Sequence, residues 1–130
     1  VNLTSKDYPD VYKFVGAAIK QVNDRQYRFG LSGLEPISVM RYTEGSFFRD
    51  HSDLGYQYDQ SAGRKISFVA QLSEGDAYQG GSLVLFGEEV MPRTRGSAFV
   101  FPSWLPHRVE TLTGGVRYTL VGWTKGPPFS

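Results

Sequence analysis

Hydrophobic positions follow a helical period near the start of the chain and the two-residue period of strands farther along. The helical set recurs every three or four residues and consists of Val11, Phe14, Val15, Ala18, Ile19 and Val22. This spacing places the apolar side chains on one face of a helix. We therefore predict an amphipathic helix over residues 8–23.

Beyond Gly30 the apolar residues become β-branched and aromatic, and they alternate with polar residues as half-buried strands do. Glycine or proline interrupts most of the gaps between these runs, as expected for short strands joined by turns. The predicted strands cover residues 27–31, 37–42, 48–51, 66–72, 82–86, 97–101, 108–111 and 116–124. We expect a mainly β fold with an N-terminal helix (α+β), whose jelly-roll core spans residues 27–124.

Length and composition narrow the class of protein. The 130 residues fit a single domain over residues 1–130, and 40% hydrophobic with 21% charged residues indicates a globular chain. The sequence lacks both an apolar run of membrane-spanning length and a signal-peptide pattern, so we expect a soluble, cytoplasmic protein. A net charge of +1 argues against nucleic-acid and membrane partners. The basic pair Arg93 and Arg95 is predicted to lie in a solvated turn.

The absence of cysteine leaves histidine and carboxylate side chains for any metal site. His51 and Asp53 are two residues apart near the end of a predicted strand, so both side chains can point to the same face. His107 follows at the start of another predicted strand. Two imidazoles and one carboxylate form the facial triad that suits non-haem Fe(II), with positions left open for a chelating cosubstrate and dioxygen.

Arg117 follows His107 by ten residues, at the start of a predicted strand with alternating inward positions. There its guanidinium can bind a carboxylate through two parallel hydrogen bonds. The alternative is an edge-strand arginine that pairs with solvent or with Glu110. A His-x-Asp triplet is a weak signal by itself because short motifs recur by chance, so its context matters.

In that context the sequence resembles the 2-oxoglutarate and Fe(II)-dependent oxygenases, and within them the prolyl 4-hydroxylase-like branch. The similarity runs from about residue 37 to residue 123, through MRYTEGSFFRDHSD, RKISFVAQLSEGDAYQGGSLVLF and FPSWLPHRVETLTGGVRYTLVGW. It implies a cupin-like double-stranded β-helix in which His51, Asp53 and His107 bind iron. It also implies that Arg117 binds the distal carboxylate of 2-oxoglutarate.

The resemblance implies further cosubstrate-binding residues. Tyr42 matches a tyrosine whose hydroxyl supports the same carboxylate, and the alternative is an aromatic residue packed in the core. Trp123 matches a tryptophan that lines the pocket, with a core role equally open. Gln71 lies where some relatives have a second tyrosine in contact with the cosubstrate, which is a departure from the family pattern.

Three residues are candidates for substrate contact. Arg64 aligns with a basic residue that opens the strand beyond the metal loop, where it would meet substrate or cap the sheet. Tyr56 and Tyr58 lie in the segment that follows Asp53. Loops at such positions often close over substrate, and the alternative is a plain exposed connection.

The implied activity is that of a dioxygenase that hydroxylates a C–H bond, consumes 2-oxoglutarate and dioxygen, and releases succinate and carbon dioxide. Ascorbate is a candidate reductant. Retention of Asp53 favours hydroxylation, because related halogenases lack this carboxylate. The substrate is a prolyl residue of a peptide or protein, another side chain, or a small molecule. A non-catalytic jelly-roll binding module and a zinc hydrolase remain alternatives, and the sequence does not indicate the oligomeric state.

Overall fold

The computed structural model describes residues 1–54, 63–87 and 89–127. Within these residues the helix α1 (Pro9–Val22) precedes nearly all of the strands, which form three antiparallel sheets. This arrangement confirms the predicted mainly β fold with an N-terminal helix. None of the described helices is long and apolar enough to cross a membrane.

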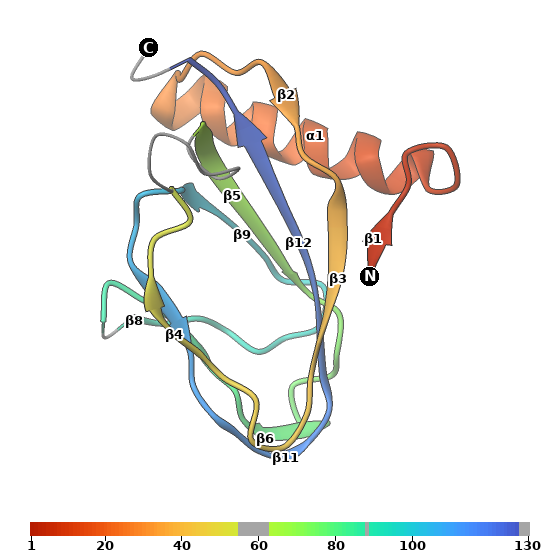
Figure 1. Ribbon diagram of the computed structural model, residues 1–130, viewed down its shortest axis with the longest axis vertical. Helices are drawn as coiled ribbons and strands as arrows, with labels where there is room; N and C mark the ends of the chain where they lie inside the picture. The colour runs from red at the N-terminus through yellow and green to blue at the C-terminus, as the bar shows by residue number, and fades with distance from the viewer. Residues whose placement is uncertain (55–62, 88, 128–130) are drawn as a thin grey trace.

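The largest sheet has a central strand that carries several of the candidate site residues. Its strands, in spatial order, are β1 (Asn2–Leu3), β3 (Ile37–Tyr42), β12 (Arg117–Lys125), β5 (Arg64–Gln71) and β9 (Ala98–Pro102), and β2 (Gly33–Leu34) also pairs with β12. In Figure 1 the long strand β12 runs between β3 and β5. Alternate side chains of β12 therefore lie beside alternate side chains of both neighbours.

Two smaller sheets complete the structure. The four-stranded sheet has the order β4 (Phe48–His51), β10 (His107–Val109), β7 (Leu83–Leu85) and β8 (Glu89–Val90). The two-stranded sheet pairs β11 (Leu112–Gly115) with β6 (Tyr78–Gly80). In the antiparallel pair of β4 and β10, His51 lies opposite His107. This register brings together the two histidines, which are far apart in the sequence.

The two faces of the large sheet pack against different elements. On the outer face, Val15 and Ile19 of α1 pack in one cluster with Ile37, Phe68 and Leu120. A Cβ atom at Gly122 would lie 3.5 Å from the Val15 side chain, an ordinary van der Waals contact, so the helix packs closely over this position. The opposite, inner face of the large sheet packs against the smaller sheets.

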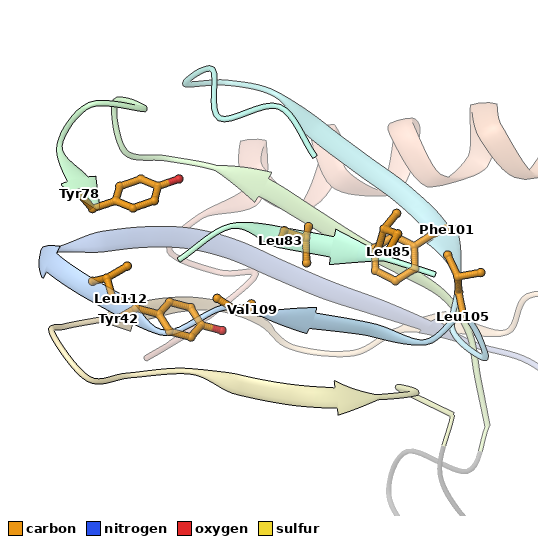
Figure 2. Packing of buried hydrophobic residues seen from close by; sticks show 8 residues of the cluster. All are labelled: Tyr42, Tyr78, Leu83, Leu85, Phe101, Leu105, Val109 and Leu112. Carbon is orange, nitrogen blue, oxygen red and sulfur yellow. The ribbon is translucent and has the colours of Figure 1, made fainter. Parts of the chain in front are cut away.

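A second hydrophobic cluster lies on the inner face. Figure 2 shows Tyr42, Tyr78 and Leu112 at one end of this cluster and Phe101 and Leu105 at the other. His107 packs edge-on against Phe101, with 5.0 Å between the ring centroids. The histidines and Tyr42 therefore lie toward opposite ends of the inner cluster.

The predicted strand over residues 27–31 is wrong. Residues 23–27 form a π-helical turn (η1, Asn23–Tyr27) that continues α1, and Arg28 ends it in the left-handed conformation. The side-chain amide of Asn23 then donates to the carbonyl oxygen of Phe29 at 2.9 Å and accepts from its N–H at 2.8 Å. The aromatic residues that suggested a strand instead stack, with 5.4 Å between the rings of Tyr27 and Phe29.

We predict that Asn23→Ala lowers the free energy of unfolding by roughly 1–3 kcal/mol, because partly buried main-chain groups of Phe29 lose their partners. Urea denaturation monitored by circular dichroism measures this change. Asp24→Asn is the matched control, since its exposed pair with Lys20 contributes little. Equal stability of the two variants would contradict the bracing role of Asn23.

The prediction of a solvated turn at Arg93 and Arg95 is wrong for Arg93. Its guanidinium donates to the carbonyl oxygens of Gly75, Tyr78 and Gly80 at 3.2, 2.8 and 2.7 Å. It also lies 4.0 Å from the centroid of the Tyr78 ring. Arg93 thus holds β6 and the preceding Gly75 in place. Arg95 instead forms an exposed ion pair with Glu74.

Candidate metal and cosubstrate site

The side chains of His51, Asp53 and His107 converge on one point between the sheets. Asp53 Oδ1 lies 3.2 Å from His51 Nε2 and 3.3 Å from His107 Nε2. The three candidate ligand atoms all lie within 4.8 Å of one another. Asp53 and His107 are buried, and His51 is partly exposed.

Both histidines are held in the tautomer that a metal requires. His51 Nδ1 lies 2.7 Å from the carbonyl oxygen of Arg49, and His107 Nδ1 lies 3.0 Å from that of Leu105. A carbonyl oxygen can only accept, so each Nδ1 carries a proton and donates it. In a neutral imidazole the Nε2 lone pair is then available to a metal ion.

Asp53 is surrounded by groups that favour its ionised form. Burial opposes ionisation, but the His107 and His51 rings and the Ser67 hydroxyl hold the pKa of Asp53 well below its usual range. The same carboxylate raises the pKa of His51 above its ordinary value. The site therefore presents a carboxylate, not a carboxylic acid, to a cation.

The other end of the inner face carries Arg117 and Tyr42, which lie opposite each other in the pairing of β12 with β3. Arg117 is 2% exposed, and its Nε is buried without a hydrogen-bond partner. Its Cζ lies 5.2 Å from the centroid of the Tyr42 ring. Burial raises the pKa of the Tyr42 hydroxyl, although the Arg117 guanidinium lowers it, so Tyr42 stays a neutral donor.

A cavity of about 310 Å³ connects the two ends, with His51, Asp53, His107, Tyr42, Arg117 and Trp123 among its lining residues. This volume is at the lower end of the range for small-molecule sites. The cavity is thus of a size to take a short dicarboxylate between the triad and Arg117.

Gln71 lies near this site but does not line the cavity. Its amide nitrogen donates to the hydroxyl of Tyr78 at 2.6 Å, and both side chains are buried. The Tyr78 ring centroid lies 6.0 Å from Arg117 Cζ. The structure thus brings a second tyrosine near Arg117 from β6, a strand that the sequence pattern did not predict.

Trp123 and Arg64 both line the cavity. The indole Nε1 of Trp123 donates to Asp53 Oδ2 at 2.9 Å, and Arg64 forms two hydrogen bonds with Glu35. The predicted substrate residues Tyr56 and Tyr58 lie outside the described residues. Ser67, which the sequence reasoning missed, donates to Asp53 Oδ2 at 2.6 Å.

The donor set fits Fe(II). Bonds of about 2.1 Å to one ion, at right angles, separate neighbouring ligand atoms by about 3 Å, close to the two distances between nitrogen and oxygen found here. Two neutral imidazoles and one carboxylate on one side of an ion leave its other side open. The mainly β fold and the donor set are thus compatible with a non-haem iron protein.

The chain belongs to the 2OG-Fe(II) oxygenase superfamily, whose sequence model matches residues 37–125. A PKHD-type hydroxylase of Rippkaea orientalis is 41% identical over 94 residues, which cover 69% of this chain and 42% of that protein. The chain therefore spans less than half the length of this relative. The matched region contains the triad and the whole of β12.

Solved structures share the fold. A Pseudomonas putida prolyl-4-hydroxylase superposes with a TM-score of 0.69 at 26% identity, over 85% of this chain and 63% of that chain. The viral collagen prolyl hydroxylase of Paramecium bursaria Chlorella virus-1 reaches a TM-score of 0.77 at 15% identity, over 98% and 78%. The second likeness extends the shared fold to nearly all of this chain.

Proposed function

We propose that this chain is the catalytic core of an Fe(II)- and 2-oxoglutarate-dependent hydroxylase. His51, Asp53 and His107 would bind the metal, and Arg117 with Tyr42 would bind the distal carboxylate of 2-oxoglutarate. Membership of the superfamily and the convergence of the triad support this assignment. The large and four-stranded sheets would be the two walls of a double-stranded β-helix.

The observation that carries the proposal is the buried guanidinium of Arg117. Among the described residues no carboxylate lies within ion-pair distance of it, and its Nε is unpaired. A buried cation without a counter-ion is unfavourable, so a carboxylate ligand at this position gains a charge-assisted bond. A zinc hydrolase or a simple metal-binding module gives this arginine no role.

When bound, Fe(II) with 2-oxoglutarate and dioxygen supplies the oxidation that converts a substrate C–H bond to C–OH, with succinate and carbon dioxide as the other products. Arg117 and Tyr42 orient the cosubstrate by holding its distal end. The apolar walls of the cavity, which include Met40, Leu83 and Val109, exclude water from the site.

A prolyl residue of a peptide or protein is the substrate class that we propose, with other side chains and small molecules as alternatives. Support comes from the two similar solved structures described above, which are both of prolyl hydroxylases. The exposed side chain of Phe48 packs at a tilt against His51, with 4.3 Å between the ring centroids, so an apolar surface borders the partly exposed side of the triad. Ascorbate as reductant is part of the same proposal.

We expect that anaerobic addition of Fe(II) and then 2-oxoglutarate produces the visible charge-transfer band of the chelate. His51→Ala is expected to lose the band, because two ligands do not hold the ion in the facial geometry. Absorption spectroscopy on protein stripped of metal measures both. Folded wild-type protein that gives no band would overturn the proposed function in favour of a non-catalytic module.

A further inference from the structure

The carboxylate of Asp53 is held by two donors that are not part of the triad. Ser67 Oγ and Trp123 Nε1 both donate to Oδ2, at 2.6 and 2.9 Å. Ser67 and Trp123 lie opposite each other in the pairing of β5 with β12. Because both donors bind the same oxygen, Oδ1 is left to face the two histidines.

The indole of Trp123 is held in turn by Arg64 and Glu35. Arg64 Cζ lies 3.8 Å from the centroid of the Trp123 ring. Glu35 accepts from Arg64 Nε at 2.7 Å and from its Nη2 at 3.1 Å, which is a bidentate pair. The main-chain N–H of Glu35 also donates to the carbonyl oxygen of Trp123 at 2.8 Å.

These contacts form a closed arrangement around one indole. The main chain of Glu35 binds the main chain of Trp123, and its carboxylate fixes the Arg64 guanidinium that lies over the Trp123 ring. The Arg64 and Glu35 side chains are only 18% and 15% exposed, so solvent screens their attraction less than at the surface. Ser103 adds a hydroxyl 3.0 Å from Ser67 Oγ, which limits the rotation of that serine.

We propose that Glu35, Arg64, Ser67 and Trp123 form a positioning clamp that sets the orientation of Asp53 in the metal site. The inference rests on the proposed function, because it takes Asp53 as a metal ligand. A carboxylate free to rotate about its Cβ–Cγ bond presents either oxygen to the ion. Two donors on Oδ2 remove that freedom before the metal binds, so the carboxylate loses less conformational entropy on binding.

The clamp gives Arg64 a role other than the substrate contact that the sequence suggested. Its described hydrogen bonds go to Glu35, and its flat face covers the indole. Glu35, which lies in the connection from β2 to β3, becomes a residue on which metal binding depends. Its effect passes through Arg64 and Trp123, so it is expected to be smaller than theirs.

Titration of the metal-free full chain with Co(II), followed by visible absorption, tests the clamp without turnover. Trp123→Phe and Ser67→Ala are each expected to weaken Co(II) binding by at least about tenfold, as loss of an outer partner of a metal ligand does. Glu35→Gln is expected to give a smaller loss. Ser67→Thr keeps the hydroxyl and is expected to restore part of the affinity.

The chain offers matched controls for two of these changes. Trp104→Phe alters the exposed tryptophan that packs against Phe29, and Glu74→Gln alters the exposed ion pair with Arg95. Neither is expected to change Co(II) affinity. Thermal unfolding of each variant separates a general loss of stability from a loss of affinity in folded protein.

The outcomes separate this inference from the proposed function. Wild-type protein that binds Co(II) and forms the 2-oxoglutarate complex, with Trp123→Phe and Ser67→Ala indistinguishable from Trp104→Phe, would overturn the clamp and leave the function intact. Weakened affinity in both variants, with an altered Co(II) spectrum and full folding, supports it. Wild-type protein that binds no Co(II) would overturn both.

Discussion

Replacing Asp53 by alanine is expected to abolish the Fe(II)–2-oxoglutarate complex and, with it, hydroxylation. Asp53 supplies the one carboxylate of the described triad, and its Oδ1 lies between the two Nε2 atoms. Loss of a residue that hydrogen-bonds to a metal ligand typically lowers metal affinity by about 10- to 100-fold. Loss of the ligand itself is therefore expected to lower it by at least about 100-fold. Fe(II) titration in the presence of 2-oxoglutarate measures the effect.

Asp50→Ala is the matched control for this variant. Asp50 lies in the same strand region, its side chain is 56% exposed, and its carboxylate lies 3.9 Å from the Arg108 guanidinium. We expect its metal affinity to stay within twofold of the wild type, since so exposed a pair contributes little. Retention of the 2-oxoglutarate complex by folded Asp53→Ala would remove Asp53 from the ligand set.

Most strands that border the site were predictable because their residue types alternate along the chain or are β-branched and aromatic. The predicted strands over residues 37–42 and 48–51 agree with β3 and β4 residue by residue, and the strand over residues 116–124 is shifted by one residue from β12. In β12 the inward row of Arg117, Thr119 and Val121 alternates with outward positions such as Leu120. A period of two survives in the sequence when the two faces differ in chemistry.

The short strands were missed for a physical reason. β1, β2 and β8 contain two residues each, and a pattern of two residues has no measurable period. β6 and β11 are rich in glycine, and close approach of the chains requires it, because a Cβ atom on Gly80 would lie 2.3 Å from the carbonyl oxygen of Thr111. Such strands are specified by their partners in the fold.

The candidate metal ligands could be proposed from the sequence, but their surroundings could not. His51 and Asp53 share a strand end, so their spacing alone places them together. Ser67 and Glu35 are single polar residues of common type, and no spacing relates them to Asp53. Their contacts arise from the register of β5 with β12 and from the path of the chain between β2 and β3.

Arg93 shows the same limit on reading charge from sequence. A basic pair in a run of polar residues is usually solvated, and Arg95 follows that rule with its exposed bond to Glu74. Arg93 departs from it because its guanidinium donates to three carbonyl oxygens, one from Gly75 before β6 and two from Tyr78 and Gly80 within β6. Main-chain acceptors have no signature in the sequence, so this contact could not be foreseen.

Arg117→Met is expected to weaken binding of the cosubstrate 2-oxoglutarate without impairing folding. Removing one partner of a buried, hydrogen-bonded charge pair costs about 2–5 kcal/mol, which corresponds to a rise of roughly 30-fold or more in the 2-oxoglutarate concentration that gives half of the charge-transfer band. Metal binding in the absence of 2-oxoglutarate is expected to be unchanged, since Arg117 is not among the candidate ligands.

The same variant is expected to leave the ligand-free protein as stable as the wild type, or more so. In the described residues Arg117 is a buried cation without a counter-ion, and a methionine of similar volume removes that cost. Arg41→Met, on the neighbouring strand β3 and exposed, is the matched control and is expected to change neither quantity. A ligand-binding role predicts that Arg117→Met weakens 2-oxoglutarate binding without destabilising the ligand-free protein. Loss of stability with unchanged 2-oxoglutarate binding would instead make Arg117 a structural residue.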